Sequence, residues 1–218
     1  MCFSATASFV TAGVTGAIGI VAVSRVTEKR ELPLAATPIL FAAQQGVEGL
    51  LWLNLPLAPD GSTSTGLTFL FLLFADVLWP VYAPIAVWLV EPNETRRRLM
   101  LVCLAVGVGV GVYFRWGILA RLHGAVVLDG HIVYLTEHGP ADLLALSYLA
   151  ATSLPLFLSS QRTLVALGIV ILGGSAVAYV SYWEAFVSVW CFFAAAASVV
   201  ILGHFERTRE QRLRIAGA

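Results

Sequence analysis

The sequence predicts an all-α membrane protein with seven transmembrane helices, and three observations indicate this fold class. Of the 218 residues, 59% are hydrophobic and only 12% are charged, whereas soluble domains carry about 25% charged residues. Seven apolar stretches approach the length of about 20 residues that a helix needs to cross a bilayer. The cations fall almost entirely into alternate connections between these stretches. We therefore expect a multi-pass protein of the plasma (inner) membrane, with the lipid bilayer as its surroundings.

The seven expected helices form a single bundle without a second domain. They are placed at about residues 5–23, 32–55, 66–90, 99–122, 141–158, 164–182 and 185–202. Between the fourth and fifth helices, Asp129-Gly130 separates two β-prone runs, and this pattern predicts a small extracytoplasmic β-hairpin. Closely spaced glycines on the first and fourth helices predict close approach of helix backbones. These glycines are Gly13, Gly16, Gly19, Gly107 and Gly111.

The orientation follows from the distribution of Lys and Arg, because cytoplasmic loops retain positive charge. All but two of the thirteen cations fall on one side of the expected bundle, and only Arg115 and Arg121 fall on the other. The larger set comprises Arg25, Lys29, Arg30, Arg96, Arg97, Arg98, Arg162, Arg207, Arg209, Arg212 and Arg214. The N-terminus is therefore expected outside, and the basic tail 203–218 inside. The net charge is zero, and the absence of a dense basic block argues against a nucleic-acid partner.

The second helix carries an unusual polar face. Gln44, Glu48 and Trp52 follow one another at intervals of four residues and share one side of the helix, with Gln45 beside them. An ionisable group inside a bilayer is costly and is by default a candidate functional site. Two interpretations stay open for Glu48: a structural group hydrogen-bonded to its glutamine and indole neighbours, or a proton-relay, ligand-binding or catalytic group.

The third helix places Asp76 near mid-depth, with Trp79 and Pro80 on the same face and Pro84 one turn later. The prolines predict a kinked helix, because each removes a backbone hydrogen bond. Such a kink beside a carboxylate can open a polar cavity, although kinked helices are also common in bundles that only pack. Trp190 on the seventh helix is expected at the level of Glu48. The candidate ligand-binding residues are Gln44, Gln45, Trp52, Asp76, Trp79 and Trp190.

Histidines and carboxylates on the outer side suggest a metal site. The candidate ligands for zinc or copper are Cys2, Glu48, His131 and His138, since thiolate, imidazole and carboxylate bind these metals. In that case Glu48 or Asp142 is the candidate catalytic base acting on metal-bound water. The spacing of the histidines is not diagnostic, and solvated loop histidines explain the same pattern. Retinal is excluded because the only lysine, Lys29, lies in a cytoplasmic loop.

Several segments resemble an uncharacterised bacterial multi-pass membrane family. They are the opening Met1-Cys2-Phe3-Ser4-Ala5-Thr6-Ala7-Ser8-Phe9, the helix start Leu32-Pro33-Leu34-Ala35, the run Gln44-Gln45-x-x-Glu48-Gly49-x-x-Trp52, Trp79-Pro80-x-x-x-Pro84 and Ser188-Val189-Trp190-Cys191-Phe192-Phe193. The resemblance covers most of the chain. It implies a compact membrane bundle of a domain of unknown function, and it carries no catalytic role over to any residue.

Three functional hypotheses follow. The leading one is a membrane protein with an outward-facing polar cavity that binds a small ligand, a metal ion or protons. One version of this hypothesis is a metal-dependent membrane enzyme. The second is a proton- or ion-coupled transporter that uses Glu48 and Asp76. The third is a membrane sensor or scaffold whose basic tail docks on anionic lipid or on a partner.

Overall fold

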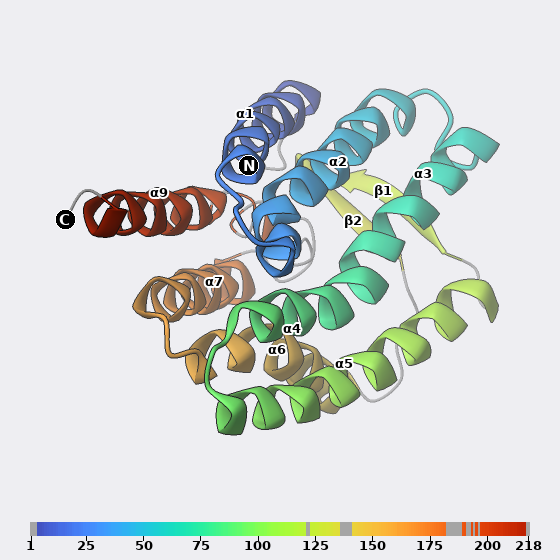
Figure 1. Cartoon of the computed structure of the whole chain (residues 1–218). Coiled ribbons are helices and arrows are strands. Elements are labelled where there is room, and N and C mark those ends of the chain that lie inside the picture. The colour runs from blue at the N-terminus through green and yellow to red at the C-terminus, as the bar shows by residue number, and fades with distance from the viewer. Residues whose placement is uncertain are drawn as a thin grey trace.

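The computed structural model describes residues 4–120, 123–135, 141–181, 189–190, 193, 195 and 197–216. Helices dominate this part of the chain and pack side by side, with one two-stranded sheet beside them (Figure 1). The α-helices are α1 (Ala5–Ser24), α2 (Leu32–Asn54), α3 (Ser62–Leu72), α4 (Trp79–Val90), α5 (Glu94–Ala120), α6 (Ala141–Leu158), α7 (Arg162–Ser181) and α9 (Ser198–Ala216). A short 3-10 helix, η1 (Lys29–Glu31), precedes α2, and a π-helical turn, η2 (Leu73–Leu78), joins α3 to α4.

Within the described residues, four helical stretches are long and apolar enough to cross a membrane. They are α1, α5, α7 and the stretch Ser62–Val90, which runs through α3, η2 and α4. Helix α2 has a comparable length of 23 residues, but Gln44, Gln45 and Glu48 lower its hydropathy. These helices fit the predicted segments to within a few residues, and α6 agrees at both ends. Of the predicted seventh helix, 185–202, eight residues lie outside the described residues (185–188, 191, 192, 194 and 196), and residues 198–202 form the start of α9.

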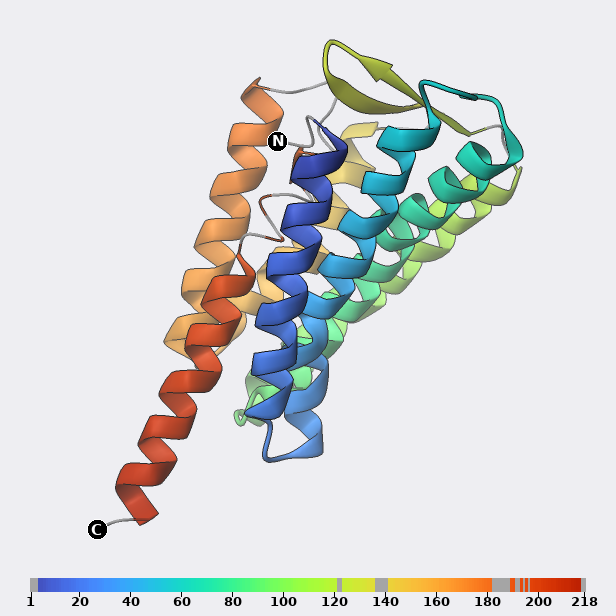
Figure 2. The same ribbon diagram turned by 90° about the horizontal axis from the view of Figure 1, so that it is seen from above.

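The bundle has two chemically different ends (Figure 2). The start of α1, the α2–α3 connection and the sheet lie at one end, which we call the hairpin end. The α1–α2 connection lies at the opposite end, toward which α9 also runs. We call this the arginine end, because the connections there and the last turns of α9 carry the larger set of cations. Helix α9 continues through the predicted basic tail to Ala216, so most of that tail is helical.

The sheet is the hairpin that the sequence predicts. Strands β1 (Gly124–Leu128) and β2 (His131–Leu135) pair antiparallel, with Leu128 opposite His131. The turn residues Asp129 and Gly130 have φ angles of 47° and 74°, and Asp-Gly tolerates this left-handed conformation better than most residue pairs. Ala125 and Ile132 are buried in a hydrophobic cluster with Leu51 and Phe71, which we call the hairpin-end core. The hairpin therefore packs on the bundle rather than standing free in solvent.

Glycines allow close approach at two helix contacts. A methyl group added at Gly107 of α5 would overlap the carbonyl oxygen of Pro80, and one added at Gly111 would meet the carbonyl oxygen of Val77. On α1, Gly19 packs directly against Ile39 of α2, and Gly16 makes an ordinary contact with α2. The prediction of close packing is therefore confirmed at these positions. It is wrong for Gly13, where an added methyl group would meet nothing within 4 Å.

Candidate functional site

A hydrogen bond between two buried side chains joins α2 to α4 in the middle of the bundle. The indole Nε1–H of Trp79 donates to Oε1 of Gln44 across 2.7 Å. Phe41, one turn before Gln44, stacks on the Trp79 ring with a centroid separation of 4.0 Å. Gln44 is fully buried, and Trp79 is 3% exposed. This contact, which we call the Gln44–Trp79 joint, fixes the register between the two helices.

The joint sets two carboxyl groups at the same depth. Helix α2 runs toward the hairpin end, so Glu48 lies one turn beyond Gln44 in that direction. The stretch from α3 to α4 runs the opposite way, so Asp76, three residues before Trp79, lies on the same side of the joint. Each turn advances about 5.4 Å along a helix. Glu48 and Asp76 therefore occupy one level of the bundle, which we call the carboxyl level.

Glu48 is enclosed by protein. Its side chain is fully buried, and Nε2 of Gln45 donates to its Oε2 across 3.2 Å. The Oε1 atom of Gln45 is buried and has no hydrogen-bond donor in the described part of the chain. The sequence places Gln44, Gln45, Glu48 and Trp52 near one face of the helix, and the structure buries the first three and leaves Trp52 half-buried against the hairpin-end core.

Asp76 lies in a π-helical turn that Pro80 explains. The N–H of Trp79 donates to the carbonyl of Phe74, five residues earlier. The next bond in that register would run from residue 80 to the carbonyl of Ala75, but proline has no N–H. The hydroxyl of Tyr148 on α6 donates to that Ala75 carbonyl across 2.6 Å. A side chain from another helix thus satisfies the backbone group that the proline leaves without a partner.

The carboxyl of Asp76 has no counter-ion and no hydrogen-bond donor among the described residues, although the residue is only 7% exposed. Turns of π-helix in membrane and soluble proteins are often found at functional sites. Trp190 lies nearby, because its ring meets the Tyr148 ring edge-on at 5.5 Å. The predicted site residues Asp76, Trp79 and Trp190 therefore lie in one part of the core, near Tyr148 and the Gln44–Trp79 joint.

Within the described residues, three side chains on α1, α2 and α3 also bury a polar atom without a hydrogen-bond partner on the hairpin side of the joint. These atoms are Oγ of Ser8, Nε1 of Trp52 and Oγ1 of Thr68. The α1–α2 contact between Phe9 and Gly49 puts Ser8 level with the segment between Glu48 and Trp52. Buried polar atoms without protein partners usually bind ordered water or a ligand. The hairpin-side half of the core is consequently rich in polar groups that have no hydrogen-bond partner among the described residues.

The predicted metal ligands are only partly within the described residues. Cys2 and His138 lie outside them, and so does the side chain of Asp142, which is in the first turn of α6. His131 begins β2 and is half-buried, and this burial lowers its pKa. No three His, Cys, Asp or Glu side chains come together as a metal site in the part of the chain that the structure describes. The zinc or copper site therefore stays a prediction.

A model for a family of unknown function, DUF6629, matches residues 1–216. The chain belongs to this family. The match agrees with the resemblance seen in the sequence motifs and covers both the carboxyl level and the arginine end. No curated protein and no solved structure matches the chain significantly. Family membership therefore assigns no chemistry to the site.

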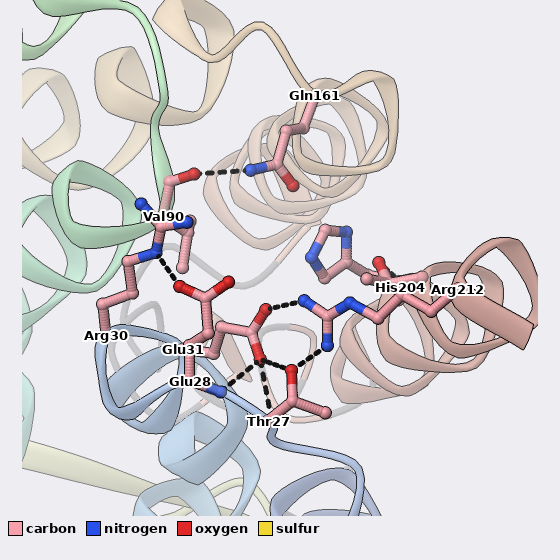
Figure 3. Close-up of polar contacts among 9 residues, drawn as sticks. Thr27, Glu28, Arg30, Glu31, Val90, Gln161, His204 and Arg212 are labelled. Atoms are coloured by element: carbon pink, nitrogen blue, oxygen red, sulfur yellow. Dashed lines mark hydrogen bonds and ion pairs between the residues drawn. The ribbon is translucent and has the colours of Figure 1, made fainter. Parts of the chain in front are cut away.

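This family member also has a polar network at the arginine end that the sequence analysis did not identify (Figure 3). Glu31 accepts a hydrogen bond from the N–H of Thr27 at 3.0 Å and from Nη2 of Arg212 at 2.6 Å. Arg212 also contacts the hydroxyl of Thr27. Burial alone would raise the pKa of Glu31, but these hydrogen bonds and the guanidinium hold it below its ordinary value. The network attaches α9 to the α1–α2 connection.

A second network at this end joins the α4–α5 connection to the α6–α7 connection. Glu91, which follows α4 and is 1% exposed, accepts hydrogen bonds from the N–H and hydroxyl of Ser160 at 2.7 and 2.8 Å and from the hydroxyl of Ser159. Gln161 donates to the carbonyl of Val90. Burial favours a raised pKa at Glu91, yet these donors lower it. The side chain of Asn93 caps the start of α5 by accepting a hydrogen bond from the N–H of Arg96. A glutamate two residues before this asparagine and a Ser-Ser-Gln run after α6 were the available sequence signals.

Proposed function

We propose that this chain is a multi-pass membrane protein whose core binds protons at Glu48 and Asp76 and couples their binding to a small polar ligand or cation. The observation that carries the proposal is the position of Asp76. Its carboxyl lies on a π-helical turn at the level of Glu48, with no cation and no donor among the described residues. A carboxylate in such surroundings is costly unless it is protonated or binds a cation.

The proposal includes an orientation, with the hairpin end outside the cell and the arginine end in the cytoplasm of a bacterial inner membrane. The clustering of cations supports it, because positive residues mark cytoplasmic loops. Single cysteines at Asp129 in the hairpin and at Glu210 on α9, in a background without native cysteines, test it in intact cells. A membrane-impermeant maleimide is expected to label Asp129→Cys only. Labelling of Glu210→Cys alone would reverse the orientation.

Ligand binding is tested by the thermal stability of the detergent-purified protein at neutral and mildly acidic pH. The probes are lithium, sodium, potassium, magnesium and calcium ions. A ligand present at 100 times its dissociation constant stabilises the folded state by about 2.7 kcal/mol. We expect mild acid or one of these cations to raise the unfolding midpoint of the wild type. The increase should disappear in Asp76→Asn.

Asp60→Asn is the matched control, because Asp60 lies in the exposed α2–α3 connection. It should respond as the wild type does. If neither acid nor any of the cations stabilised the wild type, or if Asp76→Asn together with Glu48→Gln responded unchanged, the proposed binding role of the carboxyl level would be wrong. Transport is the second candidate, and the same two carboxyls would have to be required for ion flux into proteoliposomes.

A further inference from the structure

A cavity lies on the arginine side of the Gln44–Trp79 joint, between α2, α4, α6, α7 and α9. Its volume is about 60 Å³. The stacked rings of Phe41 and Trp79 form the wall nearest the carboxyl level, and Trp190 adds a second indole. Leu34, Ala86 and other aliphatic side chains complete the lining. The cavity is therefore separate from the carboxyl level, although Trp79 contributes to both.

Four polar side chains in the lining of this cavity already donate to acceptors within the chain. The hydroxyl of Thr37 donates to the carbonyl of Pro33, and so does the hydroxyl of Tyr82. The hydroxyl of Thr152 donates to the carbonyl of Tyr148, and the indole N–H of Trp79 donates to Gln44. A water molecule in a protein cavity needs two to four polar partners. These four side chains offer it no free donor, and most of the remaining lining is aliphatic or aromatic, so the cavity favours an apolar occupant.

We infer that this cavity binds a small apolar molecule of the size of dioxygen or xenon. An engineered apolar cavity of about 150 Å³ stays dry and binds benzene or xenon. The cavity here has less than half that volume, which excludes an aromatic ring. Apolar solutes concentrate in the hydrocarbon of a bilayer, so the surroundings proposed for the chain would supply such a molecule. The inference goes beyond the proposed function and does not depend on protonation of Asp76 or Glu48.

Xenon is the probe, and its ¹²⁹Xe NMR chemical shift in detergent micelles is the measurement. Non-specific contacts change the xenon chemical shift linearly with protein concentration. A binding site adds a change that saturates as the site fills with xenon. We expect the wild type to show the saturable change. In Ala86→Leu, the added side chain would occupy the cavity and abolish that component. Ala105→Leu adds the same volume to an exposed position on α5 and should keep it.

The smaller change Ala83→Val, also in the lining, serves if Ala86→Leu does not fold. It should weaken xenon binding several-fold. A wild type without a saturable component would overturn the inference, and so would a saturable component unchanged in both folded lining variants. Asp76→Asn should bind xenon as the wild type does, so this test and the cation test for the carboxyl level can fail separately.

Discussion

Trp79 donates its indole N–H to Gln44 across 2.7 Å in the centre of the bundle. This contact joins α2 to α4, as does the hydrogen bond from the Tyr82 hydroxyl to the Pro33 carbonyl, and it separates a polar region from an apolar cavity. On its hairpin side lie the two buried carboxyls, Glu48 and Asp76. On its arginine side lies a cavity with a mainly apolar lining. The proposals for both regions therefore depend on the integrity of this joint.

The joint can be tested by a double-mutant cycle. Gln44→Leu would leave the Trp79 N–H buried without an acceptor, which costs about 1–3 kcal/mol. We expect a lower midpoint of thermal unfolding in detergent for this variant. Adding Trp79→Phe removes the orphaned donor, so the double variant should lose less stability than the sum of the two single changes. Strict additivity would show that the two side chains do not interact.

Tyr148 is predicted to stabilise the π-helical turn. Tyr148→Phe removes the hydroxyl that donates to the Ala75 carbonyl and leaves that carbonyl without a donor. The expected loss is about 1–3 kcal/mol of unfolding free energy. Tyr113→Phe is the control, because Tyr113 is 41% exposed on α5. Equal unfolding midpoints for the two variants would contradict the role given to Tyr148.

The contact between α5 and the kinked stretch should be sensitive to a single methyl group. Gly107→Ala would press a methyl group against the carbonyl of Pro80, and overpacking of this kind costs about 1–3 kcal/mol. Gly109, two residues away on the same helix, has open space at the corresponding position. Gly109→Ala should therefore be neutral or slightly stabilising. The prediction fails if both variants unfold at the wild-type midpoint.

Attachment of α9 to the α1–α2 connection should weaken in acid. The folded protein lowers the pKa of Glu31, so the stability from its ionised form is present above the unfolded-state pKa. That stability is lost as pH falls through the folded-state pKa. We expect faster hydrogen exchange of the last turns of α9 at acidic pH. Glu31→Gln should show fast exchange already at neutral pH, while Arg214→Ala should exchange as the wild type does. Identical exchange in all three proteins would refute the attachment.

Much of the architecture follows from the sequence, for clear physical reasons. Long apolar runs favour helices because a bilayer leaves the backbone no other donors or acceptors. Asp-Gly specifies the hairpin turn, since Asp129 and Gly130 both need positive φ angles. The polar face of α2 can also be predicted from the sequence, because Gln44 and Glu48 are about one helical turn apart.

Other features depend on tertiary contacts that spacing does not reveal. Two prolines predict a kink near Asp76, but the π-helical form of that turn also depends on the Tyr148 hydroxyl from α6. The pair Glu31 and Arg212 is separated by 181 residues, and charge counting places both at one end without indicating that they bind. The apolar cavity similarly arises from five helices, so no local pattern encodes it.

The central claim is that the carboxyl level holds protonated side chains inside the bundle, and infrared spectroscopy tests it most directly. The C=O stretch of a neutral carboxylic acid is separate from that of a carboxylate, so its absorbance reports the protonated form. In the purified protein at neutral pH, we expect this band to be present, to decrease in Asp76→Asn and to decrease further when Glu48→Gln is added. Asp60→Asn should leave it unchanged. A wild-type spectrum without the band, in the absence of any added cation, would contradict the claim.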